Sequence, residues 1–119
     1  MDVQFPLFVF EKDDRSTYLI ETPERVFYHL EPVDIEDGEY LFWDSNGAGV
    51  CVSVVRAKLK QIAPCAEKIS LREAFETYAQ TYGLQLCLKE SPLDTWRSLQ
   101  SQLPPKKTLW ARLFRRPKS

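Results

Sequence analysis

Histidine and cysteine are scarce in this chain, and their spacing suits no metal site. The sequence has one histidine and three cysteines, and it contains no CxxC pair. Zinc sites need clustered ligands, and disulfide frameworks need cysteines in even number. We therefore expect no metal, no other cofactor and no disulfide, and we expect all the cysteines to be free thiols.

The neighbours of each cysteine predict its exposure. Cys51 lies among valines and Cys87 among leucines, so both are expected to be buried like small hydrophobic residues. Cys65 follows Pro64 in an expected loop and is the thiol predicted to be exposed. Exposure alone does not make a cysteine reactive, because reactivity also needs surroundings that favour the thiolate.

Motifs of common enzymes are missing as well. The chain contains no G-x-G-x-x-G, no P-loop, no H-E-x-x-H and no G-x-S-x-G. His29 stands near the end of an expected helix, where the helix dipole favours it, and its spacing supplies no nucleophile. We expect a protein without catalytic residues, and a small enzyme using Cys65 or His29 is the weakest hypothesis.

Long hydrophobic runs are absent too. No stretch approaches the roughly 18 apolar residues that a membrane span requires. The start, Met1-Asp2, is followed by neither a basic segment nor an apolar segment of a signal peptide. These features predict a cytoplasmic protein.

Apolar and aromatic residues are nevertheless plentiful enough for a folded core. Hydrophobic residues make up 44% and aromatic residues 13% of the 119 residues. A chain of this size buries a core without metals or disulfides. We expect one domain over residues 1–103, followed by a separate tail over residues 104–119.

The first half of the chain predicts strands and one short helix. Residues 3–10 and 17–20 are β-prone and joined by a charged turn, which indicates a hairpin. Thr22-Pro23 can begin a helix that ends near Pro32. Asn46-Gly47 favours a second hairpin between strands 40–43 and 50–55, with Arg56, Lys58 and Lys60 as a basic continuation that can twist or bulge.

The second half predicts helices around one strand. Ser70 and Glu73 form a capping box before apolar residues at helical spacing, and Gly83 ends that helix. Residues 84–88 alternate like a strand, and Ser91-Pro92 begins a helix that runs to residue 103. The order favours an α+β fold, with two or three helices on one face of a mainly antiparallel sheet of four to five strands.

Charge is distributed very unevenly although the formal net charge is only −1. Residues 1–50 hold twelve acids and three bases, a net −9, and residues 51–103 hold seven bases and five acids, a net +2. Residues 104–119 hold six bases and no acid. Opposed blocks of charge indicate that their placement serves a purpose.

The basic tail has an amphipathic pattern. Leu109, Trp110, Leu113 and Phe114 share one helical face. Such a segment fits an anionic membrane surface or nucleic-acid phosphates, a partner protein, or the acidic part of its own domain. The residues expected to make the tail contact are Lys106, Lys107, Trp110, Arg112, Phe114, Arg115 and Arg116.

The acidic first half suggests a protein-binding surface. Acids speed the encounter with a basic partner, and aromatic side chains beside them supply affinity. The alternative is that the aromatic residues are core and the acids only keep the protein soluble. The residues predicted to bind a partner are Asp13, Asp14, Glu36, Asp37, Glu39 and Trp43.

In size and acidity the chain is similar to small bacterial cytosolic binding proteins such as toxin-neutralising immunity proteins, a likeness of composition that transfers no residue roles. The first hypothesis is a non-enzymatic interaction domain that binds a protein through the acidic surface. The second is a peripheral module whose tail contacts anionic membrane or nucleic acid. A homodimer is also compatible with the sequence.

Overall fold

The structure is a computed structural model that describes residues 3–12, 16–66 and 69–103. The predictions for Asp13 and Asp14, and all those for the tail over residues 104–119, lie outside the described residues.

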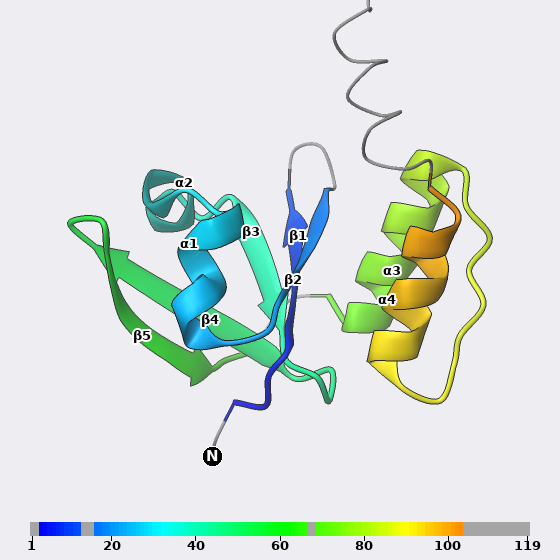
Figure 1. The fold of residues 1–119 in the computed structure, drawn as a ribbon, viewed down its shortest axis with the longest axis horizontal. Helices are drawn as coiled ribbons and strands as arrows, with labels where there is room; N and C mark the ends of the chain where they lie inside the picture. The colour runs from blue at the N-terminus through cyan, green and yellow to red at the C-terminus, as the bar shows by residue number, and fades with distance from the viewer. Residues whose placement is uncertain (1–2, 13–15, 67–68, 104–119) are drawn as a thin grey trace, which may run out of the picture.

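An antiparallel sheet of five strands forms the centre of the fold, in the order β2-β1-β3-β4-β5 (Figure 1). The fold is α+β, as the sequence predicts. The two predicted hairpins are present as β1 with β2 and as β3 with β4. The strands are β1 (Leu7–Glu11), β2 (Thr17–Ile20), β3 (Tyr40–Trp43), β4 (Gly49–Val55) and β5 (Lys58–Pro64).

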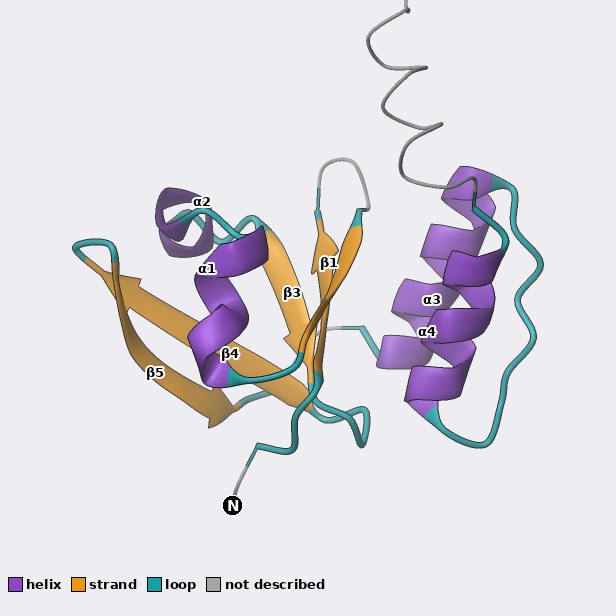
Figure 2. Ribbon diagram, viewed as in Figure 1, coloured by secondary structure: helices purple, strands orange, loops and turns teal. Residues whose placement is uncertain are grey.

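Helices lie on both faces of this sheet rather than on one face as predicted (Figure 2). One face packs against the short α1 and α2, and the other packs against the longer α3 and α4. The helices are η1 (Pro23–Arg25), α1 (Val26–His29), α2 (Pro32–Glu36), α3 (Leu71–Tyr82) and α4 (Pro92–Ser101).

Strand β1 joins the two cores because it is apolar on both sides. Leu7 and Val9 pack in the core under α1 and α2, whereas Phe8 and Phe10 pack in the core under α3 and α4. Successive residues of a strand point to opposite faces, so four consecutive apolar residues fill two cores. All four are at most 3% exposed.

Trp43 belongs to the core under α3 and α4 and is 1% exposed. Its ring meets the edge of Phe10 at a centroid distance of 5.8 Å. The prediction that Trp43 contacts a partner is therefore wrong, because strand alternation turns this side chain inward.

Helix α3 confirms the strongest sequence signal. The Ser70 side chain accepts a hydrogen bond from the Glu73 amide at 3.1 Å, and the Glu73 carboxylate accepts one from the Ser70 amide at 3.0 Å. Gly83 ends the helix in the left-handed conformation, with φ of 65°. The predicted helix 92–103 is confirmed as α4, where Ser91 caps the first turn.

The predicted strand at residues 84–88 is wrong, because this segment pairs with no described strand. It runs back along α3 and α4, which lie side by side and point the same way (Figure 1). Gln102 holds it there, donating to the Gln85 carbonyl and accepting from the Gln85 amide, both at 2.8 Å. The alternation is real, since Leu84 and Leu86 turn toward the core.

A third hairpin, β4 with β5, replaces the predicted basic continuation of the strand. Arg56 and Ala57 form its turn with φ of 52° and 64°. Such turns usually carry Asn or Gly, so the sequence gives no warning of this one. The predicted irregularity is present, because the register shifts by one residue and leaves Lys60 without a partner on β4.

The short helix α2 was not predicted. Pro32 sits at its start and Gly38 follows it with φ of 73°, which are the usual positions for these residues. Thr22, predicted as a cap, makes no side-chain capping bond to η1.

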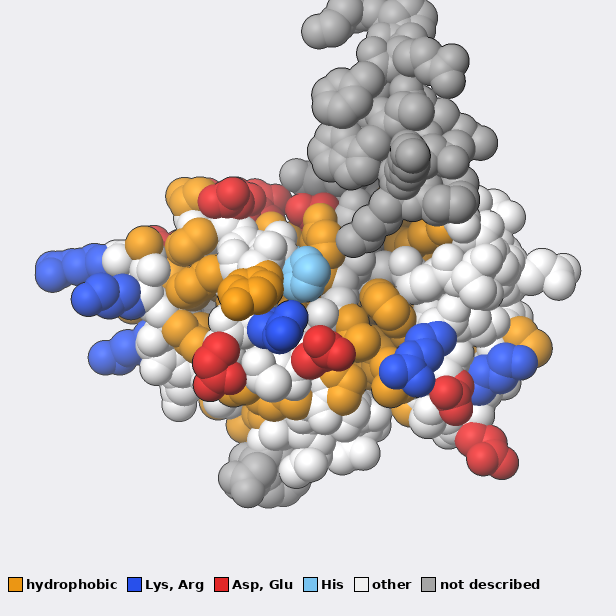
Figure 3. Space-filling model, viewed as in Figure 1, with side chains coloured by type: hydrophobic (Ala, Val, Ile, Leu, Met, Phe, Trp, Pro, Cys, Tyr) orange, Lys and Arg blue, Asp and Glu red, His pale blue; other side chains and the backbone are white. Residues whose placement is uncertain are grey.

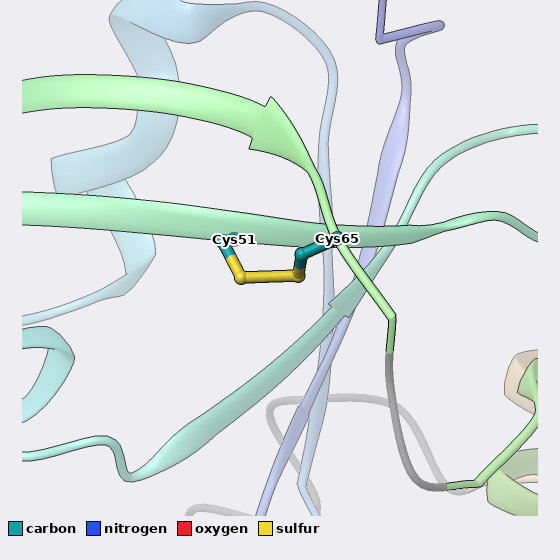
Figure 4. The surroundings of a disulfide bond; sticks show 2 residues. All are labelled: Cys51 and Cys65. Atoms are coloured by element: carbon teal, nitrogen blue, oxygen red, sulfur yellow. A yellow bond between two sulfur atoms is a disulfide. The ribbon is translucent and has the colours of Figure 1, made fainter.

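Cys51 and Cys65 form a disulfide, which corrects the expectation of three free thiols (Figure 4). The bond links β4 to the chain just after β5. Cys51 is exposed because it points away from the core that holds Val50 and Val54, and the free Cys87 is exposed because it alternates with Leu86. The prediction that both are buried is wrong, because their apolar neighbours in sequence point to the opposite side of the extended chain.

The core position of Trp43 predicts a large loss of stability on truncation. Trp43→Ala should lower the free energy of unfolding by about 3–5 kcal/mol. The control Tyr28→Ala removes an aromatic side chain that is 71% exposed and should change it by less than about 0.5 kcal/mol. Urea denaturation measures both, and equal losses would contradict this core.

The disulfide closes a loop with a sequence separation of 14. Replacing Cys51 and Cys65 with serine should cost about 3 kcal/mol of unfolding free energy, because the open chain gains conformational entropy. Cys87→Ser, the matched control, should change little. Alkylation of the unreduced, denatured protein should label Cys87 alone, and labelling of all three cysteines would contradict the bond.

Candidate functional site

The residues considered for catalysis do not form a site. Cys65 is bonded to Cys51, so the prediction of an exposed free thiol there is wrong. His29 is in the last turn of α1, as predicted, and its ring stacks on Tyr18 at a centroid distance of 5.6 Å. This contact orients the exposed histidine ring against Tyr18 of β2.

Metal-binding residues are not gathered in the part of the chain that the structure describes. No group of three His, Cys, Asp or Glu side chains there could hold an ion. The described helices also include none that is long and apolar enough to cross a membrane.

A groove of about 320 Å³ lies where α3 and α4 begin, with Leu71 and Phe75 among its lining residues. Helix N-termini attract anions through their free amides. Here, however, the serine caps Ser70 and Ser91 each occupy an amide of the first turn. Arg72, which also lines the groove, pairs with Glu76 at 3.5 Å. The groove therefore shows no arrangement built for a ligand.

The most distinctive surface is the outer side of η1, α1 and α2, here called the α1–α2 face. It is strongly acidic, since residues 21–39 contain seven acids and a single arginine. The predicted residues Glu36 and Asp37 are exposed on it, and Glu39 is half-buried just before β3. The acids are Glu21, Glu24, Glu31, Asp34, Glu36, Asp37 and Glu39.

Apolar side chains are exposed among these acids. Phe27 is 39%, Tyr28 71% and Val33 60% exposed. The Arg25 guanidinium lies over the Tyr28 ring, 5.2 Å from its centroid. Figure 3 shows hydrophobic side chains over this region, with acidic side chains toward α2 and basic ones toward the tip of the β4–β5 hairpin.

The exposed aromatic residues were recognisable from helical spacing. Val26 and Leu30 are four residues apart and are both buried, so they define the inner side of α1. Phe27 and Tyr28 then fall outside it. Tyr28 takes the exposed position that Trp43 was expected to hold.

Helix stability does not explain the two acids at the C-terminal end of α2. Glu36 ends this helix and Asp37 follows it, where the negative end of the helix dipole disfavours carboxylates. The Glu36 carboxylate lies 3.5 Å from the Ala57 amide in the neighbouring hairpin turn, which is at the outer limit of a hydrogen bond.

Tyr40 is buried near acidic side chains, and their negative charge affects the pKa of its phenol. Burial, followed by the nearby Glu11 and Asp34 carboxylates, raises the pKa of its phenol to about 12. A hydrogen bond with the Glu31 backbone opposes this rise. The raised pKa reflects a low-dielectric position next to negative charge.

The chain matches no protein-family model, no curated protein and no solved structure. Evidence for function therefore comes from the surface itself.

The raised pKa of Tyr40 makes stability depend on alkaline pH. The folded state holds this proton more tightly than the unfolded state, so its contribution is complete below pH 10 and is lost as pH rises toward about 12. Tyr40→Phe should reduce the fall in unfolding free energy over this range, and Tyr28→Phe controls for loss of a phenol.

Burial raises the pKa of Tyr78 as well, so part of the fall should remain in Tyr40→Phe. Urea denaturation at successive pH values measures these profiles. Identical profiles for Tyr40→Phe and the parent protein would contradict the position of Tyr40.

Proposed function

We propose that this protein is a non-enzymatic interaction domain that binds a basic protein partner through the α1–α2 face. The observation that carries the proposal is Tyr28, which is 71% exposed in the middle of an acidic stretch. Exposed apolar patches rimmed by polar residues mark interaction sites, and tyrosine is enriched among the residues that carry interface affinity.

The two kinds of side chain have different roles in such an interface. Carboxylates such as Glu36 and Asp37 attract a basic surface over a distance and speed association. Burial of Phe27, Tyr28 and Val33 then supplies affinity, because apolar area leaves water. Arg25 already holds the Tyr28 ring, which lowers the entropy lost on binding.

The same negative charge repels nucleic-acid phosphates and anionic lipid, so this face selects for a protein. The similarity in size and acidity to toxin-neutralising immunity proteins is compatible with a basic partner and remains one of composition. A second copy of the chain could also cover the exposed part of this face. The molar mass in solution distinguishes such a homodimer from a monomer.

The second hypothesis, that the tail contacts anionic membrane or nucleic acid, is supported by six bases without an acid in residues 104–119. The cytoplasmic location also stays a prediction. The Cys51–Cys65 disulfide argues against a cytoplasmic location, because disulfides persist mainly in oxidising compartments.

Photo-crosslinking tests where the partner binds. A benzoylphenylalanine placed at Tyr28 should capture a protein with a basic surface in cells that make this chain. The same probe at Gln80, an exposed position on α3, is the control. Identical captures from both positions would overturn the proposed face.

Substitutions then measure the interface with the purified partner. Tyr28→Ala should weaken binding roughly 30-fold, the loss expected at a hot spot. Glu36→Lys with Asp37→Lys should weaken binding and reduce its dependence on salt. The matched reversal Glu76→Lys with Glu90→Lys changes the same charge near α3 and α4 and should have little effect. Unchanged affinity in the first two variants would refute the proposal.

A further inference from the structure

The tail of the chain carries the chemistry that the α1–α2 face selects. Residues 21–39 have a net charge of −6, from seven acids and Arg25, and residues 104–119 have a net charge of +6. The tail also places Trp110 and Phe114 at helical spacing, where they can meet Phe27 and Tyr28. Charge and apolar groups are thus complementary within one molecule.

The length of the tail limits how far its apolar residues can reach from the end of α4. The described chain stops at Leu103, just beyond α4, and sixteen residues follow. Phe114 is eleven residues beyond Leu103, which allows at most about 36 Å of extended chain and less where the tail is helical. The molecule measures 44 × 36 × 23 Å. The end of α4 and helix α2 both lie in the upper part of the view, on opposite sides of the sheet (Figure 1).

We propose that residues 104–119 dock on the α1–α2 face of the same molecule. The tail cations, Arg112, Arg115 and Arg116 foremost, meet the acids of residues 21–39, and Trp110 or Phe114 covers the exposed aromatic side chains. Intramolecular docking needs little intrinsic affinity, because tethering gives the tail a high local concentration.

Docking of the tail makes it a competitor of the basic partner, and this consequence rests on the proposed function. A face that the tail covers about nine-tenths of the time binds a partner about tenfold more weakly. The tail would then set a threshold that only a partner of higher affinity or concentration overcomes.

Paramagnetic relaxation enhancement in the full chain tests the docking without any partner. A nitroxide is attached through Ser119→Cys in a Cys87→Ser background, which leaves the disulfide intact. Amide signals of residues 23–37 should lose intensity, and those of residues 74–82 on α3 should not. The loss should disappear near 1 M salt, where the screening length is about 3 Å.

Two charge variants make the result specific. Glu36→Lys with Asp37→Lys should abolish the intensity loss, and Glu76→Lys with Glu90→Lys should preserve it. Full intensity at residues 23–37 in the parent chain would overturn the inference. Broadening seen only between a labelled chain and a separate isotope-enriched chain would also overturn it, in favour of a second copy as occupant.

Vesicles containing phosphatidylserine, and duplex DNA, separate the remaining destinations of the tail. Binding of the full chain to either, together with no broadening at residues 23–37, would assign the tail to that ligand and refute docking. Affinity for the crosslinked partner is measured separately with Arg112→Gln, Arg115→Gln and Arg116→Gln combined. This variant should bind the partner more tightly. If its affinity is unchanged, the competition with the partner is refuted, but the docking measured by relaxation enhancement is not.

Discussion

The burial of β1 on both faces is the constraint on which the rest of the molecule depends. Phe8 and Phe10 give α3 and α4 an aromatic floor, and Leu7 and Val9 give α1 and α2 an aliphatic one. The edge-to-face contacts of Phe10 with Trp43, Phe75 and Tyr78 extend this floor across three elements. Helices of four and five residues, such as α1 and α2, are not stable without tertiary packing. Strand β1 supplies that packing through Leu7 and Val9.

Elements specified by local chemistry were predictable, and those specified by distant contacts were not. The capping box at Ser70 and the turn at Asn46-Gly47 each fix backbone geometry within a few residues. By contrast, the turn at Arg56 and Ala57 lacks the usual residues, and the extended segment at residues 84–88 is held by the Gln102 side chain just beyond α4 instead of by a strand. Alternation alone cannot tell a strand from an extended segment that packs on helices.

The acidic residues of the candidate site were predictable from the sequence, but its exposed aromatic residue was not. Glu36 and Asp37 are on the surface because carboxylates are rarely buried. Trp43 follows the strand alternation into the core, whereas Tyr28 is outward because Val26 and Leu30 fix the inner side of α1. The disulfide was missed since Cys51 and Cys65 come together only through the unpredicted β5 hairpin.

The edge strand β5 combines several features that discourage pairing with other chains. Lys60 stands outside the register, Lys58 is exposed, Pro64 lacks an amide hydrogen, and the disulfide fastens the strand at its end. Cys51, Ser53 and Val55, on the outer side of β4, are exposed as well. The disulfide thus fastens β4 to β5, where the sheet is packed on only one face. Substitutions of Ser53 and Val55 disturb no core, so over evolutionary time these positions are the part of the sheet most free to acquire new side chains.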